Sequence, residues 1–310
     1  MDYTTFGRTG LRVSVMGLGC GGPSRIGQRT NRTSAESIAV IRDALDAGIN
    51  YIDTAEAYGT EPLVGKALTG VDRSKVVIST KKSYRNGISP SSVRETLEQS
   101  LRDLNTDYVD IYNLHGVVPQ DYARLRDEIL PVFFDLRDEG KLRFIGVSEL
   151  FGQDTTHEML HQSLPENVWD VVMVGFNILN QTARDTVFPL TQAEDVAVQI
   201  MYAVRLALSQ PAKLAAALET LIAEGQLDAD EVDLANPLGF VMEESDATSL
   251  VDASYRFCRY EPGVHVVLSG TGNPVHLKSN IESLSRPPLP VAVVHKLRHI
   301  FRQANAVTGG

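Results

Sequence analysis

Short apolar runs alternate with longer amphipathic stretches along the whole chain. Eight of these runs are rich in β-branched and aromatic residues and nearly continuous in apolar character, as the strands of a parallel sheet covered on the outside usually are. We expect buried strands at residues 14–19, 50–54, 75–80, 108–115, 143–148, 168–176, 196–202 and 265–270.

The amphipathic stretches between the runs predict helices. For residues 34–48 we expect Ser34 as the N-cap, Ser37 at the capping-box position and Gly48 as the stop, because these residue types favour helix ends. Helices are also expected over residues 89–105, 123–141 and 211–225. Pro131 either breaks or restarts the helix over 123–141, because proline removes a helical hydrogen bond.

Strands that alternate with helices in this way predict right-handed βαβ crossovers and a closed (β/α)8 TIM barrel. We expect residues 1–310 to form a single barrel domain. An open doubly wound sheet is the competing fold, since Gly17, Gly19 and Gly22 match a G-x-G-x-x-G dinucleotide fingerprint. Pro23 follows the glycines where that fingerprint needs a helix, and this favours the barrel.

One long irregular region, residues 205–262, separates the seventh run from the eighth and contains the predicted loop 227–246. A loop this long in a compact domain is usually functional or mobile.

Composition narrows the class of protein. A length of 310 residues suits one large barrel, and a net charge of −10 argues against nucleic-acid binding. Cys20 and Cys258 give neither a disulfide framework nor metal-ligand spacing, so we expect no metal and a reducing, cytoplasmic compartment. We expect no secretory signal and no membrane partner, because no segment approaches the ~20 apolar residues of a membrane helix.

Polar residues stand at the ends of the predicted strands. Asp53, Lys81 and His115 each stand at the end of an apolar run, and Tyr58 lies five residues after Asp53. Strand ends meet at one rim of a barrel. A phenol becomes a useful acid at neutral pH when a cation stabilises its phenolate, and Lys81 can supply that cation while Asp53 keeps it charged. His115 can hold a carbonyl oxygen.

Each residue also has a structural interpretation. Asp53 can cap a turn, and either Lys81 or its neighbour Lys82 can be a solvated lysine. His115 can be a satisfied structural histidine, and Tyr58 can belong to the core. The coincidence of all four at one rim favours a proton-transfer site.

Several segments resemble signatures of the aldo-keto reductase family. These are FGRTGLRVSVMGLGCGG (6–22), DTAEAYGTEPLVGKAL (53–68), ISTKK (78–82), YNLHG (112–116), GKLRFIGVSE (140–149) and LSGTGNPVHLKSN (268–280). The first is similar to the opening β-hairpin and first strand of the family. The resemblance spans residues 3–284, and within the family it is greatest to bacterial sugar-oxidising members such as aldose and galactose dehydrogenases.

The resemblance implies hydride transfer between NADP or NAD and an aldehyde or sugar. It makes Tyr58 the general acid/base, tuned by Lys81 and Asp53, and it makes His115 the group that orients the substrate oxygen. The cofactor would lie extended across the barrel rim, with Ser148 at its carboxamide and Asn280 facing the adenine. The other implied cofactor residues are Gly19, Glu149, Met173, Met201, Tyr202, Ser269, Gly270, Thr271, Gly272, Asn273, His276 and Lys278.

The chain departs from the family pattern at the nicotinamide end. Glu149 stands where most members have asparagine, and a carboxylate accepts hydrogen bonds without donating them. Met173 replaces a glutamine, and Met201 stands near the usual stacking aromatic, with Tyr202 as the alternative. His276 occupies a position where NADP-specific relatives often carry arginine, so we expect weak discrimination between NADP and NAD, with Lys278 responsible for any preference.

The substrate is predicted less directly. Walls of the substrate pocket should come from residues 20–32, 116–124 and 227–246. The first segment is rich in hydroxyl, amide and Arg groups, and Trp is absent from all three. This composition favours a small polar substrate such as a sugar. The alternative interpretation is that the three segments are solvated loops and do not form a pocket.

Two other functions stay open. One is a Schiff-base aldolase that uses Lys81 or Lys82 as the nucleophile. The other is a cofactor-binding, redox-sensing subunit with little turnover.

Overall fold

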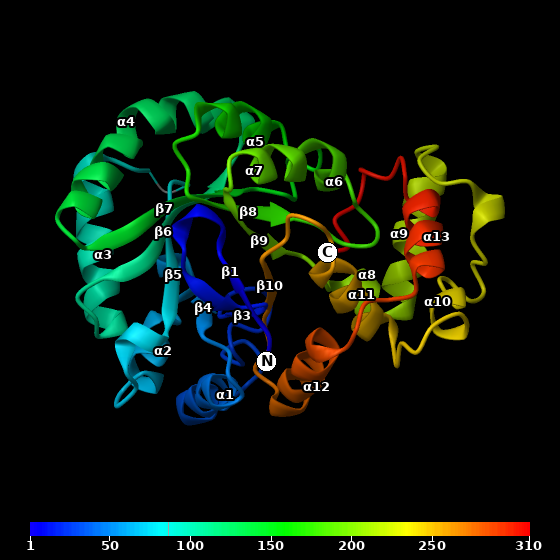
Figure 1. The fold of residues 1–310 in the computed structure, drawn as a ribbon, viewed down its shortest axis with the longest axis horizontal. Helices are drawn as coiled ribbons and strands as arrows, with labels where there is room; N and C mark the ends of the chain where they lie inside the picture. Colours follow the sequence, from blue (N-terminus) through cyan, green and yellow to red (C-terminus); the bar gives the residue numbers. More distant parts are fainter. Residues whose placement is uncertain (86) are drawn as a thin grey trace.

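The computed structural model describes residues 1–85 and 87–310, and its centre is a closed barrel of eight strands in the order β10-β3-β4-β5-β6-β7-β8-β9 (Figure 1). All neighbouring pairs in the barrel are parallel. The strands are β3 (Met16–Gly19), β4 (Tyr51–Asp53), β5 (Val77–Ser83), β6 (Val109–Val117), β7 (Leu142–Glu149), β8 (Val171–Gly175), β9 (Ala197–Met201) and β10 (Val266–Ser269). The predicted (β/α)8 fold is confirmed, and closure through the β10–β3 pair excludes the open sheet.

Two strands extend two or three residues beyond their predicted ends, and β7 extends by one residue, to Glu149. β5 continues to Ser83 and β6 to Val117. Lys81 therefore lies within β5, paired in register with Asn113, and His115 lies within β6 opposite Ser83. The β5 strand outlasts its apolar run because its last three residues are polar but continue the ladder. The β6 strand continues through Gly116 to Val117, which pairs with Glu149 of β7.

An N-terminal hairpin of β1 (Tyr3–Thr5) and β2 (Arg12–Ser14) precedes the barrel, as the resemblance implied. Phe6, at its turn, packs edge-on against Tyr51 with 5.4 Å between ring centroids. The hairpin and the first inward-facing strand residues form a separate apolar cluster of Phe6, Leu11, Val13, Tyr51, Val77, Ile111, Val171, Ala197 and Val266. This cluster fills the amino end of the barrel, so a functional cavity belongs at the carboxyl end.

Helices surround the strands (Figure 1). They are α1 (Ser34–Asp46), α2 (Glu61–Ala67), α3 (Pro90–Leu104), α4 (Pro119–Asp138), α5 (Glu158–Ser163), α6 (Ala183–Thr186), α7 (Phe188–Ala193), α8 (Leu206–Ser209), α9 (Pro211–Ala223), α10 (Phe240–Glu243), α11 (Leu250–Arg259), α12 (Pro274–Ser285) and α13 (Val291–Ile300). The helix α4 runs without interruption through Pro131, which is exposed.

The predicted cap of α1 is wrong by one residue. Thr33 is the N-cap: its hydroxyl accepts from the Glu36 amide at 3.2 Å, and the Glu36 carboxylate accepts from the Thr33 amide at 2.8 Å. This is a complete capping box, which Ser34 cannot form because it is already in the first helical turn. Ser37 is buried, and its hydroxyl accepts from the Gln28 side chain at 3.0 Å.

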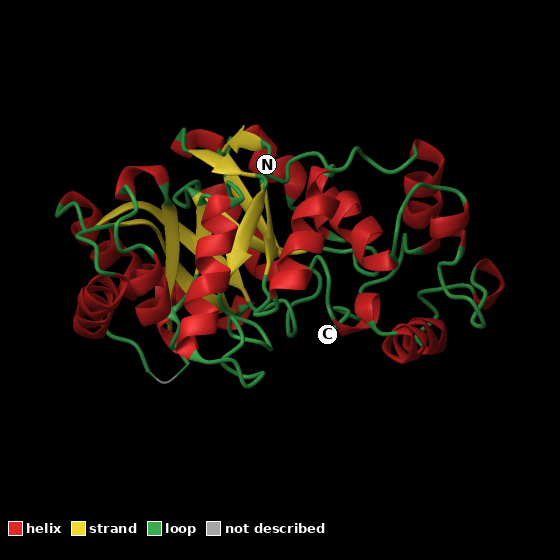
Figure 2. Ribbon diagram, turned by 90° about the horizontal axis from the view of Figure 1, so that it is seen from below, coloured by secondary structure: helices red, strands yellow, loops and turns green. Residues whose placement is uncertain are grey.

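The C-terminal third adds a helical layer beside the barrel. In Figure 1, α9, α10 and α13 gather beyond one side of the strands, and Figure 2 shows the same separation between a strand-containing part and a purely helical part. Lys296 of α13 pairs with Glu244 at 2.8 Å, and Gln226 bonds Asn305 at 2.7 Å. The predicted loop 227–246 is therefore held against α13 and carries only short helical turns.

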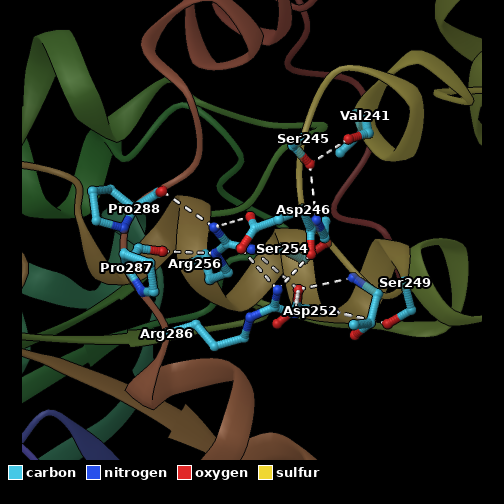
Figure 3. Close-up of polar contacts among 12 residues, drawn as sticks. Val241, Ser245, Asp246, Ser249, Asp252, Ser254, Arg256, Arg286, Pro287 and Pro288 are labelled. Atoms are coloured by element: carbon cyan, nitrogen blue, oxygen red, sulfur yellow. Dashed lines mark hydrogen bonds and ion pairs between the residues drawn. The ribbon is translucent and has the colours of Figure 1, made fainter.

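A buried arginine of α11, Arg256, connects this helix with the segments around it (Figure 3). The Arg256 guanidinium lies 2.7 Å from Asp246 and 3.3 Å from Asp252, and it also donates to the carbonyl oxygens of Pro287 and Pro288. The network links α11 with the loop before it and with the proline-rich connection that leads to α13. Within the described part of the chain, none of the helices combines the length and apolar character needed to cross a membrane.

Candidate active site

A cavity of about 680 Å³ opens at the carboxyl end of the barrel. The predicted site residues that line it are Gly19, Asp53, Tyr58, His115, Ser148, Glu149, Met173, Met201, Tyr202 and Gly270. Lys81 lies directly behind this surface and is fully buried. The structure therefore brings together the predicted catalytic residues and the predicted nicotinamide-end residues.

Tyr58 reaches the cavity from a single helical turn after β4. The turn, Glu56–Tyr58, ends at Gly59, whose φ of +70° explains why glycine follows the tyrosine. The Tyr58 hydroxyl lies 3.2 Å from His115 Nε2, and the two rings meet edge to face. A Cβ at Gly21 would lie only 2.4 Å from the Tyr58 ring, so Gly21 lets the backbone cover the phenol closely.

Lys81 and Asp53 form a buried ion pair beneath Tyr58. Lys81 Nζ lies 2.6 Å from both carboxylate oxygens of Asp53 and 2.7 Å from the Thr54 carbonyl. These three acceptors match the three protons of an ammonium group. Lys81 therefore acts on Tyr58 through space, 5.2 Å from the ring centroid, rather than by a direct hydrogen bond.

Burial opposes the charge on Lys81, but Asp53 and Tyr58 outweigh it and raise the pKa of the lysine. Burial also raises the pKa of Tyr58, and the Lys81 charge opposes that rise. The lysine thus acts on the phenol in the predicted direction.

His115 is electrically neutral at physiological pH. Burial, together with the nearby charges of Lys81 and Arg85, lowers its pKa from 6.5 to about 3. A neutral imidazole has one N–H to donate and one nitrogen that accepts. It can therefore share a proton with Tyr58 or donate to a carbonyl oxygen without adding charge.

Two residues that the sequence did not single out support Asp53. The Ser79 hydroxyl donates to Asp53 Oδ1 at 3.0 Å, and Asn113 Nδ2 donates to the Ser79 oxygen at 3.0 Å. Both lie inside neighbouring strands. The polar positions within otherwise apolar runs were the available signal for them.

The nicotinamide end differs from expectation in one respect. Ser148, Met173, Met201 and Tyr202 line the cavity. The Glu149 side chain is fully buried, and its carboxylate bonds to His157 at 2.8 Å and to the Gly175 amide at 2.7 Å. The structure therefore directs this carboxylate into the protein instead of toward the cavity.

The predicted phosphate and adenine residues lie outside the cavity, except Gly270. The Ser269 hydroxyl is 2.8 Å from the Tyr255 hydroxyl and accepts from Asn280 Nδ2 at 2.9 Å, so Asn280 points inward. The Thr271 hydroxyl accepts from the Asn273 amide at 3.0 Å.

Farther along this predicted site, Gly272 packs against the backbone of Gly27, where a Cβ would come within 2.3 Å. His276 and Lys278 are exposed on α12.

The predicted walls are only partly correct. Residues 21–24 and Gly116 line the cavity, but no described lining residue comes from 227–246. That loop packs on α13 instead, a long-range contact that its own sequence does not specify. The structure adds lining residues that the sequence analysis missed, among them Arg85, Leu150, Phe151 and Arg205. Arg85 follows the true end of β5, and Phe151 follows the end of β7, so their positions just beyond strands were the available signal.

Over residues 1–85 and 87–310, no group of three or more His, Cys, Asp or Glu side chains is placed to hold a metal ion. The arrangement offers a phenol, a neutral imidazole and a buried ion pair around one cavity. This set can donate and accept a proton at a carbonyl or hydroxyl oxygen.

Comparison with known proteins gives a consistent result. Residues 16–301 match the model of the Aldo/keto reductase family. An uncharacterised oxidoreductase of Bacillus subtilis, YqkF, is 26% identical over 98% of this chain and 97% of its own length. An L-galactose dehydrogenase of Arabidopsis thaliana is 34% identical over 48% of this chain and 49% of its own length. The holo form of an aldo-keto reductase from Bacillus halodurans has the same fold, with a TM-score of 0.72 and 24% identity over 99% of this chain and 97% of that one.

Proposed function

Because the chain belongs to the aldo/keto reductase family, an oxidoreductase family whose members use NAD(P)H, we propose that it transfers a hydride between a nicotinamide dinucleotide and an aldehyde or sugar, with Tyr58 as general acid/base. The observation that carries this proposal is the Tyr58 hydroxyl in the cavity, 3.2 Å from His115 Nε2 and beside the buried Lys81–Asp53 pair.

The cavity fits the nicotinamide end of such a cofactor. Its volume of about 680 Å³ lies within the usual range of ligand sites. The Ser148 hydroxyl offers a hydrogen bond there, and Gly19 lines the cavity without a side chain. The bound dinucleotide would supply or accept the hydride.

The residues of this chain would handle the proton. During reduction, negative charge develops on the carbonyl oxygen, and Tyr58 donates its proton there. Lys81 stabilises the phenolate that remains, Asp53 keeps Lys81 charged, and His115 orients the oxygen by donating a hydrogen bond. Oxidation of an alcohol or sugar reverses these steps. Positioned acid–base catalysis of this kind is typically worth about 10² to 10⁴ in rate.

Substitution of Tyr58 tests this function. In Tyr58→Phe we expect kcat to fall about 10²- to 10⁴-fold with little change in cofactor affinity, because the ring remains and only the proton is lost. Steady-state kinetics on a panel of small aldehydes, aldoses and aromatic ketones, together with a cofactor titration, would measure both. Wild-type turnover in folded Tyr58→Phe would refute the role of Tyr58. A marked preference for bulky ketones would refute the polar substrate.

The Schiff-base alternative finds little support. Lys81 is fully buried and its pKa is raised, whereas a nucleophilic lysine needs a lowered pKa. Lys82 pairs with Glu56 at 3.1 Å. Borohydride trapping of a carbonyl substrate on either lysine would revive this alternative.

For the cofactor we propose weak discrimination between NADP and NAD. His276 and Lys278 are both exposed on α12, where either could approach a ribose phosphate. Arginine is the side chain best suited to hold a phosphate bidentately, and neither position carries it. In Lys278→Ala we expect any NADP preference to disappear, with His276→Ala as the matched control. A thousand-fold NADP preference that survives Lys278→Ala in a titration of both cofactors would contradict the proposal.

A further inference from the structure

The strand end next to Ser148 carries a buried charged residue that the proposed proton transfer does not use. Glu149 Oε1 accepts from the Gly175 amide at 2.7 Å, and both carboxylate oxygens lie within 3.0 Å of His157 Nδ1. The side chains of Glu149 and His157 are both fully buried. One carboxylate thus joins the end of β7 to the end of β8 and to a residue eight positions later.

His157 is fixed from its other side as well. His157 Nε2 lies 2.9 Å from the Thr182 hydroxyl, which in turn contacts the Thr155 carbonyl and the Asn180 side chain, both acceptors, at 3.0 and 2.6 Å. These contacts hold the Thr182 hydroxyl, and with it the His157 ring, in one orientation. His157 also has a left-handed backbone with φ of 65°, which is uncommon outside glycine.

The ring that is held in this way supports a wall of the cavity. Phe151 lines the cavity and stacks on His157, with 5.5 Å between centroids and an interplanar angle of 8°. The Phe151 ring also meets the Tyr202 ring edge to face, with 5.4 Å between centroids. Gly175 lies directly against the Phe151 ring, where a Cβ would come within 2.1 Å. His157 itself does not line the cavity.

We propose that Glu149 and His157 are a positioning pair: they fix the aromatic wall of Phe151 and Tyr202, and through it the nicotinamide end of the cofactor site. The proposal rests on the proposed function, since it needs a dinucleotide in the cavity. Glu149 acts on the cofactor through His157 and Phe151, although family resemblance implied a direct carboxamide contact.

Four variants separate positioning from general stability. Glu149→Ala removes the bonds to His157 and Gly175. Glu149→Gln keeps the length and shape of the side chain, and its amide oxygen can still accept from the Gly175 amide. His157→Asn keeps the left-handed backbone, which asparagine tolerates, but removes the stacked ring. Glu261→Ala is the matched control: it breaks another buried ion pair, with Arg184 at 2.6 Å, whose two residues do not line the cavity.

The readouts are cofactor Kd by fluorescence titration with NADPH and NADH, kcat at saturating cofactor, and Tm. In Glu149→Ala and His157→Asn we expect Kd to rise at least tenfold, or about 1.4 kcal/mol, and kcat at saturating cofactor to fall by a smaller factor than Kd rises. Glu149→Gln should restore a Kd within about threefold of wild type. Glu261→Ala should lower Tm and leave Kd unchanged.

Unchanged Kd in both Glu149→Ala and His157→Asn overturns the inference while the proposed function stands. The inference also fails if Glu261→Ala raises Kd as much as Glu149→Ala does. If wild type binds neither dinucleotide, the proposed function fails first and the inference falls with it.

Discussion

His115 illustrates how a single buried residue links the site to stability. Its pKa is lowered from 6.5 to about 3 by burial and by the charges of Lys81 and Arg85. Between pH 6.5 and 3 the unfolded chain binds a proton that the folded protein does not. The free energy of unfolding therefore falls as pH falls through this window, by at most about 1.4 kcal/mol per pH unit from this residue.

We expect His115→Asn to weaken this acid dependence. Its free energy of unfolding should decline less steeply than that of wild type between pH 6.5 and 4.5, because the side chain that resists protonation is gone. Urea titrations of both proteins at several pH values in this interval would measure the two slopes. Equal slopes would mean that His115 is already protonated in the folded protein.

Prediction from sequence at the residue scale succeeded where backbone position decided the outcome. Asp53, Lys81 and His115 converge because parallel strand ends share one rim. It failed where a side chain chooses between distant partners. The Glu149 side chain points toward His157, and the Asn280 side chain points toward Ser269. The sequence around each residue does not indicate these partners.

At the scale of elements, the segment 21–32 covers the site as a strap of consecutive turns. Gly21 packs on the Tyr58 ring, and Gly27 packs on Gly272. The strap thus joins the catalytic phenol to the segment that resemblance assigns to the cofactor phosphates. Its backbone can lie so close because glycines stand at the contacts.

We expect Gly272→Ala to loosen the strap. The new Cβ would meet backbone atoms of Gly27 at 2.3 and 2.4 Å, so the backbone itself must shift. Trypsin should then cleave faster at Arg25, Arg29 or Arg32, which can be followed by mass spectrometry. Gly152→Ala is the control, since a Cβ there meets nothing within 4 Å. Equal cleavage rates in both variants would show that the strap does not depend on this contact.

The prediction of helices and loops from the sequence had a similar limit, because it located the helices without their exact caps or their long-range contacts. The existence of α1, α3, α4 and α9 follows from apolar spacing, but the cap of α1 depends on which of two adjacent hydroxyl residues has a carboxylate three positions later. Thr33 has Glu36, and Ser34 has Ser37. The destination of the loop 227–246 depends on α13, which lies about fifty residues farther along the chain.

At the scale of the whole molecule, the barrel and the helical layer beside it have separate roles. The cavity is built from the barrel rim, the strap and residues 204–209, whereas α10 and α13 contribute no described lining residue. The alternation of apolar runs predicted the barrel because closure follows from repeated βαβ units. The added layer has no such repeat, and long-range ion pairs hold it in place.

The Arg256 network allows this division to be tested (Figure 3). Arg256 is 1% exposed and Asp252 is 1% exposed, and Asp252 also pairs with Arg286 at 2.9 Å. Removing one partner of a buried ion pair leaves an uncompensated charge and typically costs about 3–5 kcal/mol. Because Arg286 remains beside Asp252, we expect Arg256→Met to cost about 3 kcal/mol in denaturant unfolding.

Arg302→Met provides the contrast, because Arg302 forms a more exposed pair with Glu231 at 3.0 Å. Such surface pairs are worth about 0–1 kcal/mol, so this variant should be nearly as stable as wild type. Both variants should keep wild-type kcat per folded molecule, since neither arginine lines the cavity. A loss of kcat in folded Arg256→Met would mean that the helical layer, although remote from the cavity, controls the chemistry at the barrel rim.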